Sequence, residues 1–96
     1  MRGSIAVLTV QLNLPGCNSL KQKRSTLKRL INQLQRGFNL SVAELDRLDD
    51  RDSAVIACAS LSNDPTHSRQ VLQNAIRFIQ EEFRDLEIIE DQINFF

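Results

Sequence analysis

The 96-residue sequence has no tryptophan or tyrosine, and only two cysteines, two prolines and one histidine. Cys17, Cys58 and His67 are too few to supply the four ligands of a structural zinc site, so we expect no metal. Two unpaired thiols are typical of a reducing cytosol. No apolar run approaches the roughly 20 residues that a membrane-spanning helix needs. We therefore expect no membrane segment, no signal peptide and a cytoplasmic location.

All five aromatic residues are phenylalanines, which bears on nucleic-acid binding. RNA-recognition motifs stack bases on aromatic side chains of an open sheet. Phe38, Phe78 and Phe83 read as core residues, and Phe95 and Phe96 end the chain. The expected sheet centre has no aromatic residue, so we reject base stacking on the sheet while leaving contact with the phosphate backbone open.

Acidic residues are missing from the first third of the chain. Residues 1–37 contain seven Lys or Arg and no acid, whereas residues 38–96 contain five Lys or Arg and all twelve Asp and Glu. The net charge is therefore zero, but the two parts differ in sign. Such asymmetry indicates either an anionic partner or attraction between the two parts within the fold.

One helix, over about 19–36, organises this basic part. Ser19 is a predicted N-cap, and Gln22 completes a capping box with it. Gly37 is the expected stop, because glycine readily takes the left-handed conformation. An apolar stripe recurs at helical spacing; it consists of Leu20, Leu27, Leu30, Ile31 and Leu34.

The rest of the chain predicts four strands and a second helix. Alternation over 5–14, a run over 38–45, an Ala-rich apolar run over 53–61 and a final run over 86–95 favour strands. The acidic residues over 46–52 are typical of a hairpin loop. Asp64 and Pro65 predict the start of the second helix, whose apolar face extends to Phe83.

The order strand–helix–strand–strand–helix–strand predicts one α+β domain over residues 1–96, a four-stranded antiparallel sheet with both helices on one face. We expect the first and third strands to be a parallel central pair. The two loops that begin the helices would then lie side by side. The other face would be open and weakly polar, formed by Thr9, Gln11, Asn13, Ser41, Cys58 and Ser60. The expected core consists of Leu8, Val10, Leu27, Leu30, Ile31, Leu34, Val42, Val55, Leu72, Phe78, Ile79 and Ile88.

Several short motifs occur in one register along nearly the whole chain. They are Leu14-Pro15-Gly16, Ser19-Leu20-Lys21, Lys23-Arg24, Phe38-Asn39, Ser41-Val42-Ala43-Glu44 and Ser62-Asn63-Asp64. Together they resemble the YlxP-like family of small bacterial proteins, which carry a domain of unknown function. The resemblance implies a ferredoxin-like fold and genes that often lie near those for translation and ribosome maturation. The chain departs from the family pattern at Arg51-Asp52-Ser53, where a Trp-Gln-Arg run is expected.

The candidate anion-binding or RNA-binding residues are Lys21, Lys23, Arg24, Ser19 and Asn63, with the helix start at Asp64. Cations in a first helical turn work against the helix dipole, which indicates a role other than helix stability. The alternative is structural. Arg24 could pair with Asp64 across the two loops, and Lys23 could extend its stem over the edge of the core.

No set of residues predicts catalysis or a cofactor site. His67 has only Asp64 as a nearby carboxylate, and no phosphate-loop pattern follows Pro15-Gly16. We therefore expect a non-catalytic RNA-associated or ribosome-associated module that uses its basic first helix. The alternative is a protein-interaction module or homodimer that acts through the open sheet face or the last strand, where Phe95 and Phe96 invite pairing.

Overall fold

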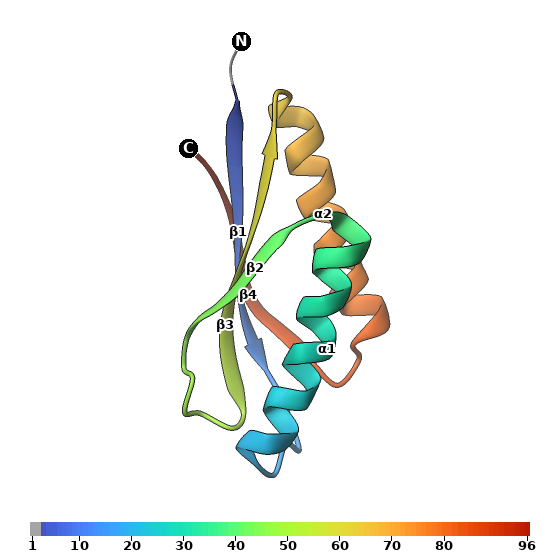
Figure 1. The fold of residues 1–96 in the computed structure, drawn as a ribbon. Helices are drawn as coiled ribbons and strands as arrows, with labels where there is room; N and C mark the ends of the chain where they lie inside the picture. The colour runs from blue at the N-terminus through green and yellow to red at the C-terminus, as the bar shows by residue number, and fades with distance from the viewer. Residues whose placement is uncertain (1–2) are drawn as a thin grey trace.

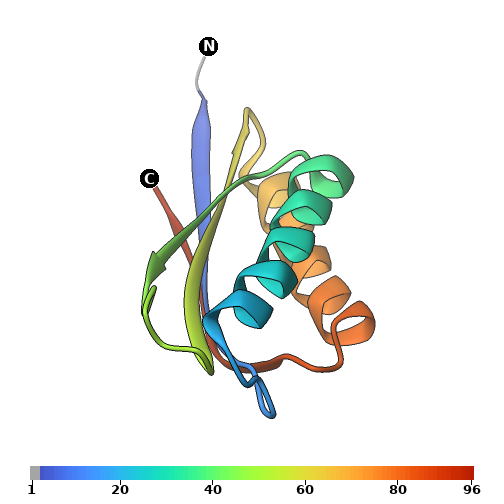
Figure 2. The same ribbon diagram turned by 60° about the horizontal axis from the view of Figure 1, so that its bottom comes forward.

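The computed structural model describes residues 3–96 and contains four strands and two helices. Both helices cover one side of the sheet (Figures 1 and 2). The elements are β1 (Ser4–Asn13), α1 (Leu20–Phe38), β2 (Ser41–Asp46), β3 (Ser53–Ser62), α2 (Pro65–Glu82) and β4 (Glu87–Phe95). The predicted order and the α+β sandwich with both helices on one face are confirmed.

The sheet has the strand order β2-β3-β1-β4, and all neighbouring strands are antiparallel. The expectation of a parallel pair between β1 and β3 was therefore wrong: Ser4 lies opposite Ser62, and Asn13 lies opposite Ser53. The reason lies in the connections. The crossover through α1 makes β1 and β2 run in the same direction, and the tight β2–β3 hairpin then reverses β3.

This reversal places the two helix starts at opposite ends of the molecule. In Figure 1, α1 begins at the bottom beside the β2–β3 hairpin, and α2 begins at the top. The expected side-by-side arrangement of the loops at Pro15–Ser19 and Ser62–Asp64 was wrong. A pair between Arg24 and Asp64 is excluded for the same reason.

Both helix starts follow their sequence signals, but α1 ends later than expected. The Ser19 hydroxyl accepts a hydrogen bond from the Gln22 amide at 3.1 Å, and Asp64 Oδ1 accepts one from the Thr66 amide at 3.0 Å. α1 continues through Gly37 to Phe38, and its C-cap is Asn39, which adopts the left-handed conformation with φ 54°. Asparagine tolerates this region better than most residues, so it replaces glycine as the C-cap.

The core lies between the helices and the inner face of the sheet. On β1 the buried residues alternate with residues that point away from the core. The buried ones, each 0% exposed, are Ala6, Leu8, Val10 and Leu12. The expected core residues Leu8, Val10, Leu27, Leu30, Leu34, Leu72 and Ile79 are buried, whereas Ile31, Val42, Val55, Phe78 and Ile88 are only partly buried. Of these, Val55 alternates with buried Ala54 and Ile56 and so belongs to the other face of the sheet.

The face of the sheet opposite the helices, here called the outer sheet face, is open. By strand alternation and register it consists of Ile5, Val7, Thr9, Gln11, Asn13, Ser41, Ala43, Asp46, Val55, Ala57, Ala59, Leu61, Glu87, Glu90, Gln92 and Asn94. Cys58 and Ser60 were wrongly expected there. Both are buried on the inner face, where Cys58 lies opposite Leu8 and the Ser60 hydroxyl lies 3.5 Å from that of Ser68.

We expect Leu30→Ala to lower the free energy of unfolding by about 2–5 kcal/mol, because it leaves a cavity at a fully buried position. Urea unfolding measures the change. Gln33→Ala on the exposed side of α1 is the control and should change stability by less than about 0.5 kcal/mol. A loss below about 1 kcal/mol for Leu30→Ala would contradict the packing described.

A pH dependence follows from the buried thiol. Burial raises the pKa of Cys58 from its ordinary 9.0 to about 12. Below pH 9 the thiol is neutral in both the folded and the unfolded chain. Between pH 9 and about 12 only the unfolded chain ionises, so stability should fall as pH rises through this window.

Urea unfolding at graded alkaline pH tests this expectation, with Cys58→Ala as the matched control. The control removes the thiol, so its stability should fall less steeply over the same window. Equal slopes for the two proteins would contradict it. The rest of the chain is common to both proteins, so its contribution cancels in the comparison.

Candidate nucleic-acid interface

Lys23 has a special position on α1, because it belongs to the buried side of the helix. It precedes Leu27, Leu30 and Leu34 at spacings of four, three and four residues, and all four side chains are buried. Lys23 itself is 1% exposed. A lysine in such a stripe must find partners for its ammonium group, because an unpaired buried charge is very costly.

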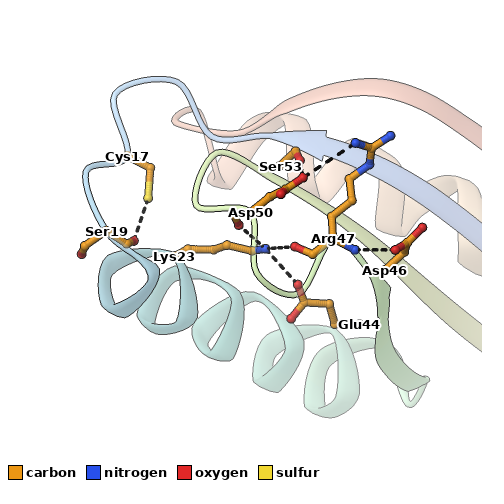
Figure 3. Close-up of polar contacts among 8 residues, drawn as sticks. All are labelled: Cys17, Ser19, Lys23, Glu44, Asp46, Arg47, Asp50 and Ser53. Carbon is orange, nitrogen blue, oxygen red and sulfur yellow. Dashed lines mark hydrogen bonds and ion pairs between the residues drawn. The ribbon is translucent and has the colours of Figure 1, made fainter.

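The partners of Lys23 come from the β2–β3 hairpin (Figure 3). The Nζ atom donates hydrogen bonds to the backbone carbonyl oxygens of Arg47 and Asp50, each at 2.6 Å. It also lies 3.1 Å from Glu44 Oε2, at the end of β2. That oxygen is buried and makes no hydrogen bond within residues 3–96, so its interaction with Lys23 is electrostatic. One cation therefore joins the first turns of α1 to the hairpin.

The hairpin needs this support because its backbone is irregular. The β2–β3 register shifts between Glu44 and Asp46, and Arg47 adopts a left-handed φ of 61°. Arg47 also donates its amide to Asp46 Oδ1 at 2.7 Å, and its guanidinium lies 3.8 Å from Asp50 Oδ2. The carbonyl groups of Arg47 and Asp50 point inward to Lys23 rather than to a strand partner.

The expected anion-binding set is therefore divided by the structure. Lys23 is a structural residue whose ammonium group is already occupied, so its assignment to an exposed anion site was wrong. Asn63 lies at the end of the sheet opposite Ser19, so these two residues cannot share a site. Lys21 and Arg24 are exposed and remain together on α1, and Ser19 is engaged as the cap of that helix.

The exposed cations of α1 form a surface that the anion-binding residues expected from the sequence only partly include. Lys21, Arg24 and Lys28 recur at spacings of three and four residues, so they form one stripe along the helix, here called the cationic stripe. Arg29 points toward α2, with its guanidinium 5.1 Å from the centre of the Phe83 ring. Within residues 3–96, none of these four side chains forms an ion pair with a carboxylate.

The signal for Lys28 was present in the sequence, since it continues the spacing of Lys21 and Arg24. The signal for Lys23 was its place in the apolar stripe. Its three oxygen partners come from residues 44–50, and nothing in the sequence near Lys23 indicates them. Arg2, another of the seven basic residues of the first third, lies outside the described residues.

A hollow near the start of α1 is lined by side chains of both charges. It has a volume of about 620 Å³ and lies between the end of β1 and the hairpin, where Arg47 and Arg51 face Asp50, Asp52 and Glu87. The nearby acids offset the two arginines, so this hollow is a poor site for an anion. Within residues 3–96 no three His, Cys, Asp or Glu side chains gather to hold a metal ion. In the same range neither helix is long and apolar enough to cross a bilayer.

The sequence matches a family model and a bacterial relative. The model of the family described as "Protein of unknown function (DUF503)" matches residues 5–93. The "Uncharacterized protein YlxP" of Bacillus subtilis is 33% identical over 61 residues, which cover 64% of this chain and 66% of that relative. The match therefore spans slightly less than two thirds of the relative's length.

Solved structures show the same architecture at low identity. The de novo designed protein Foldit4 matches with a TM-score of 0.56 and 14% identity, over 97% of both chains. SnoaB, a cofactor-independent oxygenase from Streptomyces nogalater, matches with 0.55 and 15% identity, over 96% of this chain and 90% of its own. A designed protein with a ferredoxin fold, LFR1 1, matches with 0.51 and 13% identity, over 97% and 82%. These likenesses establish the ferredoxin-like fold alone.

We expect Lys23→Met to destabilise the protein by about 3–5 kcal/mol, because it leaves the Glu44 carboxylate and two carbonyl groups without their cation. Methionine preserves most of the apolar stem, so lost packing contributes little. Urea unfolding gives the free energy, and amide hydrogen exchange over residues 44–53 should show local loosening of the hairpin.

Lys21→Met is the matched control, two residues away and exposed, and should change stability by less than about 0.5 kcal/mol. Adding Glu44→Leu to Lys23→Met should recover part of the loss, because the unpaired carboxylate is then removed. Equal stability of the two single variants would contradict a structural role for Lys23.

Proposed function

We propose a function for this chain from the premise that it belongs to the DUF503 family of proteins of unknown function. In this proposal the chain is a non-catalytic module that binds structured RNA through the cationic stripe of α1. The observation that carries this proposal is the set of exposed, unpaired cations at Lys21, Arg24 and Lys28 within the described residues. Cations left free of carboxylates on an acid-free helix suit phosphate groups, which dominate affinity for nucleic acids.

The geometry of the stripe suits a phosphate backbone. From Lys21 to Lys28 it extends roughly 10 Å along the helix axis, enough to contact about three successive phosphates of one strand. Gln22, Thr26 and Arg29 lie on the flank of α1 that faces the end of α2. Helical periodicity then places the stripe on the opposite flank, where α2 does not cover it.

Base stacking contributes little to this proposal. Phe38, Phe78 and Phe83 pack against one another, with ring centres 5.3 Å and 6.0 Å apart. Phe95 lies under the Arg69 guanidinium, 4.9 Å from its ring centre. Phosphate contacts carry no base information, so the proposed binding is selective for shape and charge rather than for sequence.

The family resemblance supports the same partner class from another direction. It implies genes that lie near those for translation and ribosome maturation, so ribosomal RNA is the structured RNA to test first. Binding should be local and moderate, because the chain as a whole is neutral.

We expect the double variant Arg24→Gln, Lys28→Gln to weaken binding of a structured RNA equally across sequences. Three neutralised phosphates give a log–log salt slope of about −2 to −3, and loss of two contacts should reduce it to about −1. Fluorescence anisotropy with labelled RNA at graded salt measures both quantities.

The matched control is Arg77→Gln, Arg84→Gln, which removes two exposed cations from α2 and the loop that follows it. It should keep the salt slope of the unaltered protein. Equal affinity and slope for the two double variants would contradict the proposed surface. Co-sedimentation with ribosomes, before and after nuclease treatment, then distinguishes ribosomal RNA from ribosomal protein as the partner.

A further inference from the structure

The charged residues of the outer sheet face are confined to its two edge strands, in a chain that is 25% charged. They are Asp46 on β2, opposite Val55, and Glu87 and Glu90 on β4, opposite Asn13 and Gln11. β1 and β3, the two central strands, contribute none. Loss of charge from the centre of a surface is the compositional mark of a protein–protein interface.

The apolar part of this face gathers at one end of the sheet. Ile5, Leu61 and Phe96 are 44%, 76% and 78% exposed. Ile5 lies opposite Leu61 on β3, and it accepts a hydrogen bond from the Phe96 amide at 2.8 Å on its other side. Strand alternation directs all three side chains outward, so the apolar surface crosses three neighbouring segments of chain.

The centre of the face is made of small side chains. Ala43 lies opposite Ala57, and Ser41 lies opposite Ala59, on the neighbouring strands β2 and β3. Side chains this small do not protrude far enough to prevent another sheet from packing closely against this face. Sheets that pack face to face lie about 10 Å apart, and this surface permits such a close approach.

We propose that the occupant of the outer sheet face is a second copy of this chain, packed sheet on sheet in a symmetric dimer. Strands of 10, 10, 6 and 9 residues form the face. With ordinary strand spacing and rise they cover roughly 550 Å². Two such faces bury roughly 1,100 Å², which exceeds the ~1,000 Å² that a specific interface requires.

The polar half of the face suits a copy of itself. Gln11, Asn13, Gln92 and Asn94 carry amide groups, and each amide both donates and accepts hydrogen bonds. A surface of this kind can satisfy its own copy across a two-fold axis, whereas β1 and β3 offer a charged partner no complementary charge. The zero net charge of the chain also leaves no overall repulsion between two copies.

Sedimentation equilibrium over about a hundredfold range of concentration tests the proposal. The unaltered protein should reach twice the 11.0 kDa mass of one chain at the high end of the range. Ala57→Glu, which places a charge at the centre of the face, should shift the dimer dissociation constant upward by at least about 100-fold. Gln73→Glu adds the same charge on the exposed side of α2 and should leave the dimer unchanged.

Leu61→Glu is the second variant, at a position 76% exposed, where a charge does not disturb the core. It decides the question if Ala57→Glu fails to fold by circular dichroism. A protein that remains monomeric over the whole range would overturn the proposal. A dimer that survives Leu61→Glu and a folded Ala57→Glu would also overturn it and would place the contact at a sheet edge.

Discussion

The buried ammonium group of Lys23 is the interaction on which the functional end of the molecule depends. It holds two carbonyl oxygens and one carboxylate of the β2–β3 hairpin against the first turns of α1. Without that cation the Asp50 carbonyl oxygen would need another donor, whereas the Arg47 carbonyl oxygen would keep only the hydrogen bond from the Asp50 amide at 3.1 Å. The β1–α1 loop, the start of α1 and the hairpin therefore behave as one unit, and the orientation of α1 relative to the sheet is fixed at this point.

The use of Lys23 inside the fold also clarifies the charge of α1. Attraction between the basic and acidic parts of the chain is partly realised in the Lys23–Glu44 contact. The residues of the cationic stripe take no part in that contact, because they lie on another flank of the same helix. The two explanations of the charge asymmetry, an internal pair and an external anion, thus apply to different residues of α1. Acids of the hairpin lie near the start of α1 and offset part of its potential there, so Arg24 and Lys28 carry more of the expected attraction than Lys21.

Much of the fold could be predicted because local signals agree with it. The alternation on β1, the caps at Ser19 and Asp64 and the stripe on α1 each survive into the structure. The direction of β3 was wrong because it depends on connectivity and not on any single residue. That error moved Asn63 into the candidate site. Cys58 was placed on the wrong face for a separate reason, because Val55 rather than Ala54 and Ile56 was taken to point inward. The partners of Lys23 could not be predicted, because they are backbone carbonyl groups of an irregular hairpin.

The two surfaces with proposed partners lie on opposite sides of the sandwich and differ in their physics. The cationic stripe belongs to the helical layer and acts through charges that salt screens within about 10 Å. The central strands of the outer sheet face carry no charge, so contacts there depend on buried area and change little with salt. Pairing of two sheets would leave both copies of α1 on the outside, with each cationic stripe exposed. Raised salt should therefore separate the two activities in one experiment, because it releases a phosphate backbone from α1 while sheet-to-sheet contact persists.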